Sequence, residues 1–308
     1  FPSWTEVRAT EYINLADGDG DGREELLLPN NGTGSGAGAD FYGIFSCVDG
    51  TLESGFPTFK TELYMPRAAT EMIGGPVGCE AADVDGDGIK EPIFIGWDLG
   101  KISVLDAVKP DSFVIAKNIR YDYSGDDAVF YVSLGHYDID GDGAEELMGA
   151  SADPTAANPP GFIPLMKFPK KISDFDPKNP AHLSMIRSNI GTPNFNNVLG
   201  DINGDGKAEL FYCRYTRGQV QALSYRGGDI MNPANWVTSE GFYDNSFVAK
   251  PQKSAYADTN IYKKELGWWN GGVLSQIHGS YGIKMANDLD KDGKKELVIS
   301  AIESPFSD

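Results

Sequence analysis

The chain has 308 residues, of which 41% are hydrophobic, and this is enough to bury one large core or two small ones. Its formal net charge is −19, which argues against nucleic acid as a partner because an acidic surface repels phosphates. No segment approaches the run of about 18 apolar residues that a membrane helix needs, so no membrane span is expected. The 37 glycines, 18 prolines, 14 tyrosines and 16 phenylalanines favour many short strands joined by tight turns.

One sequence pattern occurs five times along the chain: D-x-[D/N]-x-D-G-x-x-E, followed by a short apolar run. The copies begin at Asp17, Asp83, Asp138, Asp201 and Asp288, and are therefore 66, 55, 63 and 87 residues apart. Each interval has room for one small sheet of about four strands. Five copies with one internal spacing are not a chance event, so each copy is expected to mark one structural unit.

Period-2 patterns predict the strands of these units in chain order. A strand enters the motif, as in EYINLAD and VSLGHYD, and another leaves it, as in PIFIG and ELFYC. A third strand is predicted at 100–107 and 218–225, and a more variable fourth at 111–119 and 234–243. Four antiparallel strands per repeat form a propeller blade, so the expected fold class is an all-β propeller with five motif-bearing blades.

Other calcium-loop architectures disagree with this context. An EF-hand needs its glutamate at loop position 12 and a helix on each side, whereas here the glutamate is at position 9 and strand-forming residues follow. Dockerin-like modules would place two motifs closer together, with helices. The nonapeptide of calcium-binding β-helices is absent from the sequence.

The five motifs, each ending an incoming strand and opening an outgoing one, resemble the FG-GAP/VCBS repeats of integrin-α-type β-propellers. The resemblance covers essentially the whole chain. It implies a β-propeller of four-stranded blades with calcium in the loops. It implies no single activity, because that repeat family includes adhesion receptors, lectins, lyase scaffolds and uncharacterised secreted proteins.

Calcium prefers about six to eight hard oxygen ligands, and the glycine at motif position 6 permits the loop to reverse around the ion. Side chains at positions 1, 3, 5 and 9 would bind it, with a backbone carbonyl from position 7. The ligands that the resemblance implies are Asp17, Asp19, Asp21, Glu25, Asp83, Asp85, Asp87, Glu91, Asp138, Asp140, Asp142, Glu146, Asp201, Asn203, Asp205, Glu209, Asp288, Asp290, Asp292 and Glu296. The neutral Asn203 predicts weaker binding at the fourth loop.

The charge distribution favours cation binding over the alternative of solvated acidic turns. Without the nineteen carboxylates at these positions, 26 acids face 26 bases, so the net charge resides in the loops. Carboxylates packed in one loop repel each other unless a cation is present. We expect about five Ca²⁺ sites, and a secreted or cell-surface protein, because dissociation constants of about 10⁻⁴–10⁻³ M would leave such sites empty in the cytosol.

The number of blades is open from the sequence. Integrin-like propellers have about seven blades, and the last motif leaves no room for a third and fourth strand before Asp308. We rank three explanations: a native chain that continues beyond Asp308, which would allow seven blades; strand addition by another molecule, giving a homo-oligomer or filament; and a degenerate blade. The interpretation is one propeller domain over 1–308 with an insertion at about 244–282.

Four further features of the sequence give hypotheses. In the insertion, Trp268, Trp269 and His278 are candidates for a sugar-stacking platform, although the tryptophans could equally pack the insertion onto its blade. Trp97 and Trp236 are predicted to lie in the core. The sequon at Asn31 is a candidate glycosylation site in a surface loop. The thiols of Cys47 and Cys79 could form a disulfide or remain free.

The sequence contains no recognisable catalytic signature, and His136, His182 and His278 are each predicted to be structural. The leading interpretation is a calcium-stabilised extracellular propeller that binds a protein or glycan partner or assembles with copies of itself. The alternative is a polysaccharide-degrading, lyase-like enzyme on the same scaffold, for which Lys263 and His278 would be the residues to test.

Overall fold

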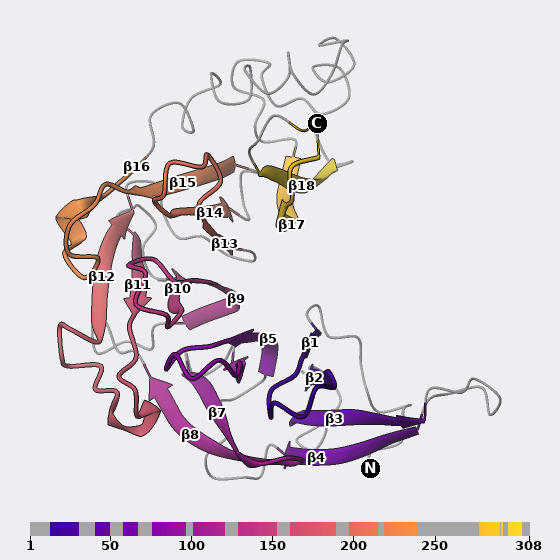
Figure 1. Ribbon diagram of the computed structural model, residues 1–308. Coiled ribbons are helices and arrows are strands. Elements are labelled where there is room, and N and C mark those ends of the chain that lie inside the picture. Colours follow the sequence, from indigo (N-terminus) through magenta and orange to yellow (C-terminus); the bar gives the residue numbers. More distant parts are fainter. Residues whose placement is uncertain are drawn as a thin grey trace. The chain divides into compact units, whose positions relative to one another are not determined.

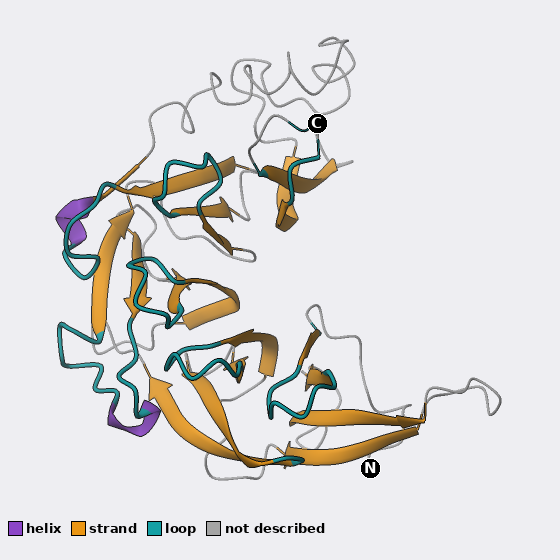
Figure 2. Cartoon of the chain, viewed as in Figure 1, coloured by secondary structure: helices purple, strands orange, loops and turns teal. Residues whose placement is uncertain are grey.

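The structure is a computed structural model that describes residues 13–30, 41–49, 58–66, 76–96, 101–120, 129–152, 161–188, 197–214, 219–238, 277–289, 291 and 295–303. The chain packs as two compact units, one of residues 1–133, 141–146 and 166–183 and the other of residues 134–140, 147–165 and 184–308. Regular structure in the described residues is almost entirely antiparallel sheet, with short 3-10 helices η2 (Ile172–Asp174) and η3 (Pro233–Asn235) (Figure 2). The predicted all-β class is therefore confirmed.

Two four-stranded sheets belong to the first unit (Figure 1). The first sheet consists of β1 (Asn14–Ala16), β2 (Glu25–Asn30), β3 (Phe41–Asp49) and β4 (Thr58–Pro66). The second sheet consists of β5 (Pro76–Ala82), β6 (Glu91–Gly96), β7 (Lys101–Lys109) and β8 (Ser112–Arg120). Each strand pairs with its neighbour in sequence, so each sheet is a simple meander.

The remaining sheets repeat the same order of strands. The third sheet consists of β9 (Val129–Tyr137), β10 (Glu146–Ala152), β11 (Gly161–Met166) and β12 (Leu183–Ser188). The fourth consists of β13 (Asn197–Gly200), β14 (Glu209–Arg214), β15 (Gln219–Tyr225) and β16 (Trp236–Thr238). A fifth sheet pairs β17 (Ile277–Ala286) with β18 (Glu296–Glu303).

Every copy of the motif therefore joins the first two strands of a sheet, as predicted. The predicted third strands at 100–107 and 218–225 correspond to β7 and β15, and the predicted fourth strand at 111–119 corresponds to β8. The fifth sheet has two strands in the described part of the chain. Residues 277–282 of the predicted insertion instead lie in β17, where Ile277, His278 and Gly282 pair with β18 and an irregularity in the register separates His278 from Gly282. Residues 244–276 are outside the described ranges.

A hydrophobic core lies between the first and second sheets. Leu27 of β2 and Tyr42 and Ile44 of β3 are buried together with Phe94 of β6 and Leu105 of β7. The rings of Tyr42 and Phe94 stack with their centroids 4.4 Å apart. Burying each such side chain stabilises the fold by about 1.5–3 kcal/mol, so this core fixes the two strands that carry each acidic loop.

A second core joins the third and fourth sheets in the other unit. Leu165 of β11 is buried with Leu210 of β14, Leu223 of β15 and Trp236 of β16. The indole Nε1–H of Trp236 donates a hydrogen bond to the carbonyl of Ile230 at 2.8 Å. The prediction that Trp236 belongs to the core is confirmed, whereas Trp97 lies outside the described residues.

Two smaller sequence questions are also answered. Cys79 is buried, its thiol is not part of a disulfide, and its Sγ–H donates to the backbone carbonyl of Leu27 at 3.5 Å. His136 lies on β9, and His182 lies in a turn before β12, where its Nδ1 accepts the backbone N–H of Asp176 at 3.0 Å.

In the described residues, no helix has the length and hydrophobicity to cross a membrane.

The loops reverse direction at two motif positions. The glycines at positions 4 and 6 adopt positive φ in four copies: 72° and 89° at Gly20 and Gly22, 76° and 91° at Gly86 and Gly88, 76° and 94° at Gly141 and Gly143, and 74° and 80° at Gly204 and Gly206. In the fifth copy position 4 is Lys291, which has φ 65°. A side chain in this left-handed region costs about 1–2 kcal/mol, so the fifth loop carries strain that the others avoid.

This difference gives a matched pair of substitutions at one motif position. Lys291→Gly is expected to raise the free energy of unfolding by up to about 1 kcal/mol, and Gly204→Ala to lower it by about 1 kcal/mol. A Cβ at Gly204 would meet nothing within 4 Å, so its cost reports backbone conformation alone. Urea denaturation measures both; a stabilising Gly204→Ala would contradict the assignment.

Candidate metal-binding loops

The first aspartate of the motif holds the loop in shape. In the second loop, Asp83 Oδ1 accepts the backbone N–H groups of Gly86 at 2.8 Å and Asp87 at 3.1 Å, and its Oδ2 accepts that of Gly88 at 2.9 Å. The fourth loop repeats this scheme around Asp201, with distances of 2.7, 3.2 and 2.8 Å. Such aspartate-centred turns explain why the spacing from position 1 to position 6 does not vary.

The glutamate at position 9 closes the loop from the start of the outgoing strand. Its Oε2 accepts the backbone N–H of position 2 in four copies, from Gly18 at 2.9 Å, Val84 at 2.8 Å, Ile202 at 3.3 Å, and Leu289. The exposed fractions of the position-9 glutamates in the first four copies are 1% for Glu25, 3% for Glu91, 1% for Glu146 and 5% for Glu209, whereas Glu296 of the fifth copy is half-buried. The first four copies therefore each place a nearly fully buried carboxylate beside the aspartates of their loop.

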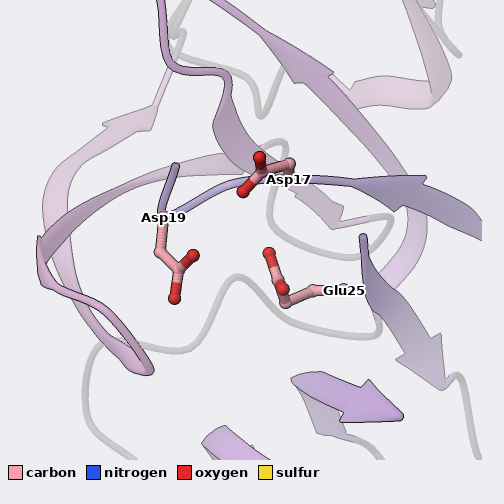
Figure 3. Close-up of side chains that lie close together, drawn as sticks. All are labelled: Asp17, Asp19 and Glu25. Atoms are coloured by element: carbon pink, nitrogen blue, oxygen red, sulfur yellow. The ribbon is translucent and has the colours of Figure 1, made fainter. Parts of the chain in front are cut away.

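Carboxylates converge in the first three loops. One oxygen from each of three side chains lies within 4.8 Å of the others in the groups Asp17, Asp19 and Glu25; Asp83, Asp85 and Glu91; and Asp138, Asp140 and Glu146. Figure 3 shows the first group, in which the three carboxylates point toward one another from the loop and from the start of β2. Positions 1, 3 and 9 thus lie together in these three loops, whereas the position-5 aspartates, which were also predicted as ligands, are not part of these groups.

Burial of these glutamates changes their protonation. Burial raises the pKa of Glu91 to about 9; the hydrogen bond from Val84 N–H opposes this shift, while the nearby Asp85, Asp87 and Asp83 add to it. Burial likewise raises the pKa of Glu25 to about 7 and that of Glu209 to about 7. The loops alone therefore stabilise the protonated form, which is the expected state of an acidic site that lacks its cation.

The residues fit a bound cation. Oδ1 of Asp17 is buried without a hydrogen-bond partner, and an isolated buried acceptor costs about 1–3 kcal/mol. A cation held between Asp17, Asp19 and Glu25 would satisfy this oxygen and offset the repulsion between the three groups. Oxygen-only donor sets of this kind suit hard divalent cations. The acidic clusters can therefore hold metal ions.

Neighbouring loops are also bonded to one another. The backbone N–H of Glu145 donates to the carbonyl of Asp83 at 2.7 Å, and the N–H of Asp83 donates to Glu145 Oε2 at 3.0 Å. In the second unit, the N–H of Lys295 donates to the carbonyl of Ile202 at 3.2 Å. In both pairs the backbone N–H at position 8 of one loop donates to a backbone carbonyl at position 1 or 2 of the preceding loop. These bonds fix the start of the preceding loop.

The motif does not include one acid that the fold brings to the first loop. Asp111, in the turn between β7 and β8, donates its N–H to Asp19 Oδ2 at 2.5 Å, and its carboxylate forms a second group with Asp19 and Asp21. A hydrogen-bonded ion pair with Lys60 lowers the pKa of Asp111. Only a Pro-Asp turn marks this position in the sequence, so its proximity to Asp19 could not be predicted.

The motif also omits a base at the third loop. Lys167 follows β11, and its Nζ lies 2.6 Å from Asp142 Oδ2 and 3.1 Å from Glu146 Oε1. Partial burial raises the pKa of Asp142, but hydrogen bonds from Lys167 and Ala144 N–H, and the charges of Lys167 and Lys170, outweigh it and lower that pKa. No local pattern in the sequence distinguishes this lysine from the lysines that follow it.

The other predicted site residues are only partly described. Asp290, Asp292, Asn31, Lys263, Trp268 and Trp269 lie outside the described residues. His278 lies on β17, but its side chain is outside the described part of the chain. The sugar platform, the glycosylation site and the enzyme alternative therefore stay predictions.

Comparison with known proteins yields distant likenesses. No protein-family model matches the chain, and no curated protein matches it. The endo-arabinase from Bacteroides thetaiotaomicron has a TM-score of 0.43 and 15% identity, over 97% of this chain and 96% of that chain. BBS1N, from a complex with ARL6DN soaked with lead, has a TM-score of 0.43 and 11% identity, over 76% of this chain and 57% of that chain. Similarities this weak transfer neither an activity nor a partner.

The raised pKa values predict how the metal-free protein responds to pH. The unfolded chain loses its glutamate protons near pH 4.5, while the folded protein keeps them up to about pH 7 at Glu25 and Glu209 and about pH 9 at Glu91, so the two states differ in bound protons over the window from about pH 4.5 to pH 9. The contribution of these groups to stability is therefore lost as pH rises through that window. Thermal melts of metal-free protein should show a falling Tm, and a flat or rising Tm would contradict the assignment.

Proposed function

We propose that the chain is a calcium-stabilised β-propeller module of the FG-GAP/VCBS type, in which the sheets are blades and the acidic loops are calcium sites. The carrying observation is the convergence, in three loops, of carboxylates from motif positions 1, 3 and 9 around a buried glutamate. The repeated hydrogen-bond scheme of the second and fourth loops supports the extension of the site to the other copies.

Calcium fits this arrangement better than magnesium does. Magnesium requires near-ideal octahedral geometry and keeps several water ligands, whereas calcium accepts more oxygen ligands in a flexible shell. Each loop offers up to four side chains and a backbone carbonyl within nine consecutive residues. Such a compact, carboxylate-rich loop suits an ion that sheds its water readily.

The proposed biological role is binding outside the cell. Sites with dissociation constants of about 10⁻⁴–10⁻³ M fill at extracellular calcium concentrations and stay empty in the cytosol. The proposed partner is a protein, a glycan or a second copy of this chain. Bound calcium would keep the sheets rigid where calcium is abundant. Because rigid sheets present their surfaces in a fixed geometry, this effect supports a binding role.

Calcium should raise the stability of the protein. At a calcium concentration about 100 times the dissociation constant, each occupied site adds about 2.7 kcal/mol to the free energy of unfolding. Thermal melts at pH 7.5 with calcium, with an equal concentration of magnesium, and with chelator measure the effect. The Tm is expected to be highest with calcium, lower with magnesium and lowest with chelator. The same Tm under all three conditions would contradict the proposal.

Glu91→Gln should act in opposite directions with and without calcium. In metal-free protein at pH 8 it removes the cost of protonating a buried carboxylate, so the free energy of unfolding should rise, by at most about 5 kcal/mol, since pH 8 lies about 3.5 units above the unfolded pKa of 4.5. With calcium present it removes a ligand, so the gain in Tm on adding calcium should shrink. The control is Glu24→Gln, which changes an exposed glutamate at position 8 of the first loop. It should change neither the free energy of unfolding of the metal-free protein nor the gain in Tm on adding calcium.

The binding role is tested separately from calcium binding. A glycan array and light scattering, each with calcium and with chelator, probe a glycan partner and self-association. Calcium-dependent retention of a glycan, or a calcium-dependent increase in mass, would support the role. Release of cleaved product from an acidic polysaccharide would instead favour the enzyme alternative.

A further inference from the structure

The third loop differs from the second in the charge that faces its ligand positions. At the second loop the nearby side chain on the third strand of the sheet is Asp106, whose pKa is raised by burial and by Asp87. At the third loop the residue after the third strand is Lys167, which bonds to Asp142 and Glu146. One loop thus gains a further negative charge where the other gains a positive one.

The position of Lys167 is specific. Asp142 and Glu146 occupy motif positions 5 and 9, which are two of the four side-chain ligand positions. Lys167 Nζ reaches both, at 2.6 and 3.1 Å, although Glu146 is only 1% exposed and the lysine side chain is 24% exposed. The stem of Lys167 is therefore packed so that its ammonium group enters the loop rather than extending into solvent.

We propose that Lys167 is an internal competitor for the cation of the third loop: its ammonium group binds Asp142 and Glu146 in place of calcium. The third loop is then held together without metal, while the second loop depends on it. This inference rests on the proposed function, because it assumes that the other loops bind calcium. It predicts that the loops fill unequally, with the third loop last.

The physical basis is charge competition over a short distance. Opposite charges in contact attract each other strongly near a protein surface, because the effective dielectric constant there is well below that of water. Calcium must displace the ammonium group from both carboxylates, and the displaced lysine must turn toward solvent. Removing the lysine charge is therefore expected to tighten calcium binding at the third loop by about tenfold or more.

The test compares Lys167→Met with the charge-preserving Lys167→Arg and with Lys171→Met, which removes an exposed lysine that pairs with Asp174. Calorimetric titration of the whole chain with calcium measures affinity, and mass spectrometry under non-denaturing conditions counts the bound ions. K167M should bind one more ion at low calcium, or bind its last ion about tenfold more tightly. K167R and K171M should match the unsubstituted protein.

The double variant K167M/D138N assigns the change to the third loop, because it should lose the gain. A thermal melt without metal adds a second readout. The Tm of K167M should be lower than that of the unsubstituted protein, because Asp142 and Glu146 lose the ammonium group of Lys167. Added calcium should restore the Tm. Should K167M require calcium to fold, K167Q replaces it and the same gain in affinity is expected.

Two outcomes would overturn the inference in different ways. If the unsubstituted protein binds calcium but K167M binds it with the same affinity and number of ions, Lys167 is a structural ion pair and the proposed function stands. If neither protein binds calcium at any concentration up to about 10 mM, well above the weakest extracellular modules, the inference and the proposed function both fail.

Discussion

The constraint on which the rest of the structure depends is a buried glutamate held beside two or three aspartates. Glu25, Glu91 and Glu209 have pKa values near or above neutrality because burial disfavours their ionised form. Each sits at the first residue of an outgoing strand, so the sheet itself fixes its position. A bound cation would relieve this cost and would allow the fold to use the same acidic turn in each of these sheets.

The loops also connect elements beyond their own strands. Glu145 grips the backbone of Asp83, and Asp111 donates to Asp19, so a loop in one sheet is held by residues that belong to the next. Side-chain cores then lock the strands beneath, as Tyr42 and Phe94 do between the first and second sheets. A cation bound at the turns would thus act on the same strand pairs as the apolar packing between the sheets.

Much of this organisation could be predicted because the motif and the strand patterns are local. The fixed spacing from Asp83 to Glu91 reflects turns that close within nine residues, and the short apolar run around Phe94 that follows this motif forms a strand whose residues are all buried. The roles of Asp111 and Lys167 depend on contacts between segments distant in sequence, which no local pattern records. The strain at Lys291 lies at motif position 4, and the need for a glycine at position 6 alone does not predict it.

The most direct measurement of the central claim is anomalous diffraction from crystals grown with calcium and then soaked with a lanthanide of similar size. The account predicts anomalous peaks inside the loops, bounded by the carboxylates of Asp17, Asp19 and Glu25 and of Asp83, Asp85 and Glu91, with a weaker peak at the loop that contains Asp142. Well-ordered loops without peaks, with Glu25 and Glu91 hydrogen-bonded as neutral acids, would contradict it.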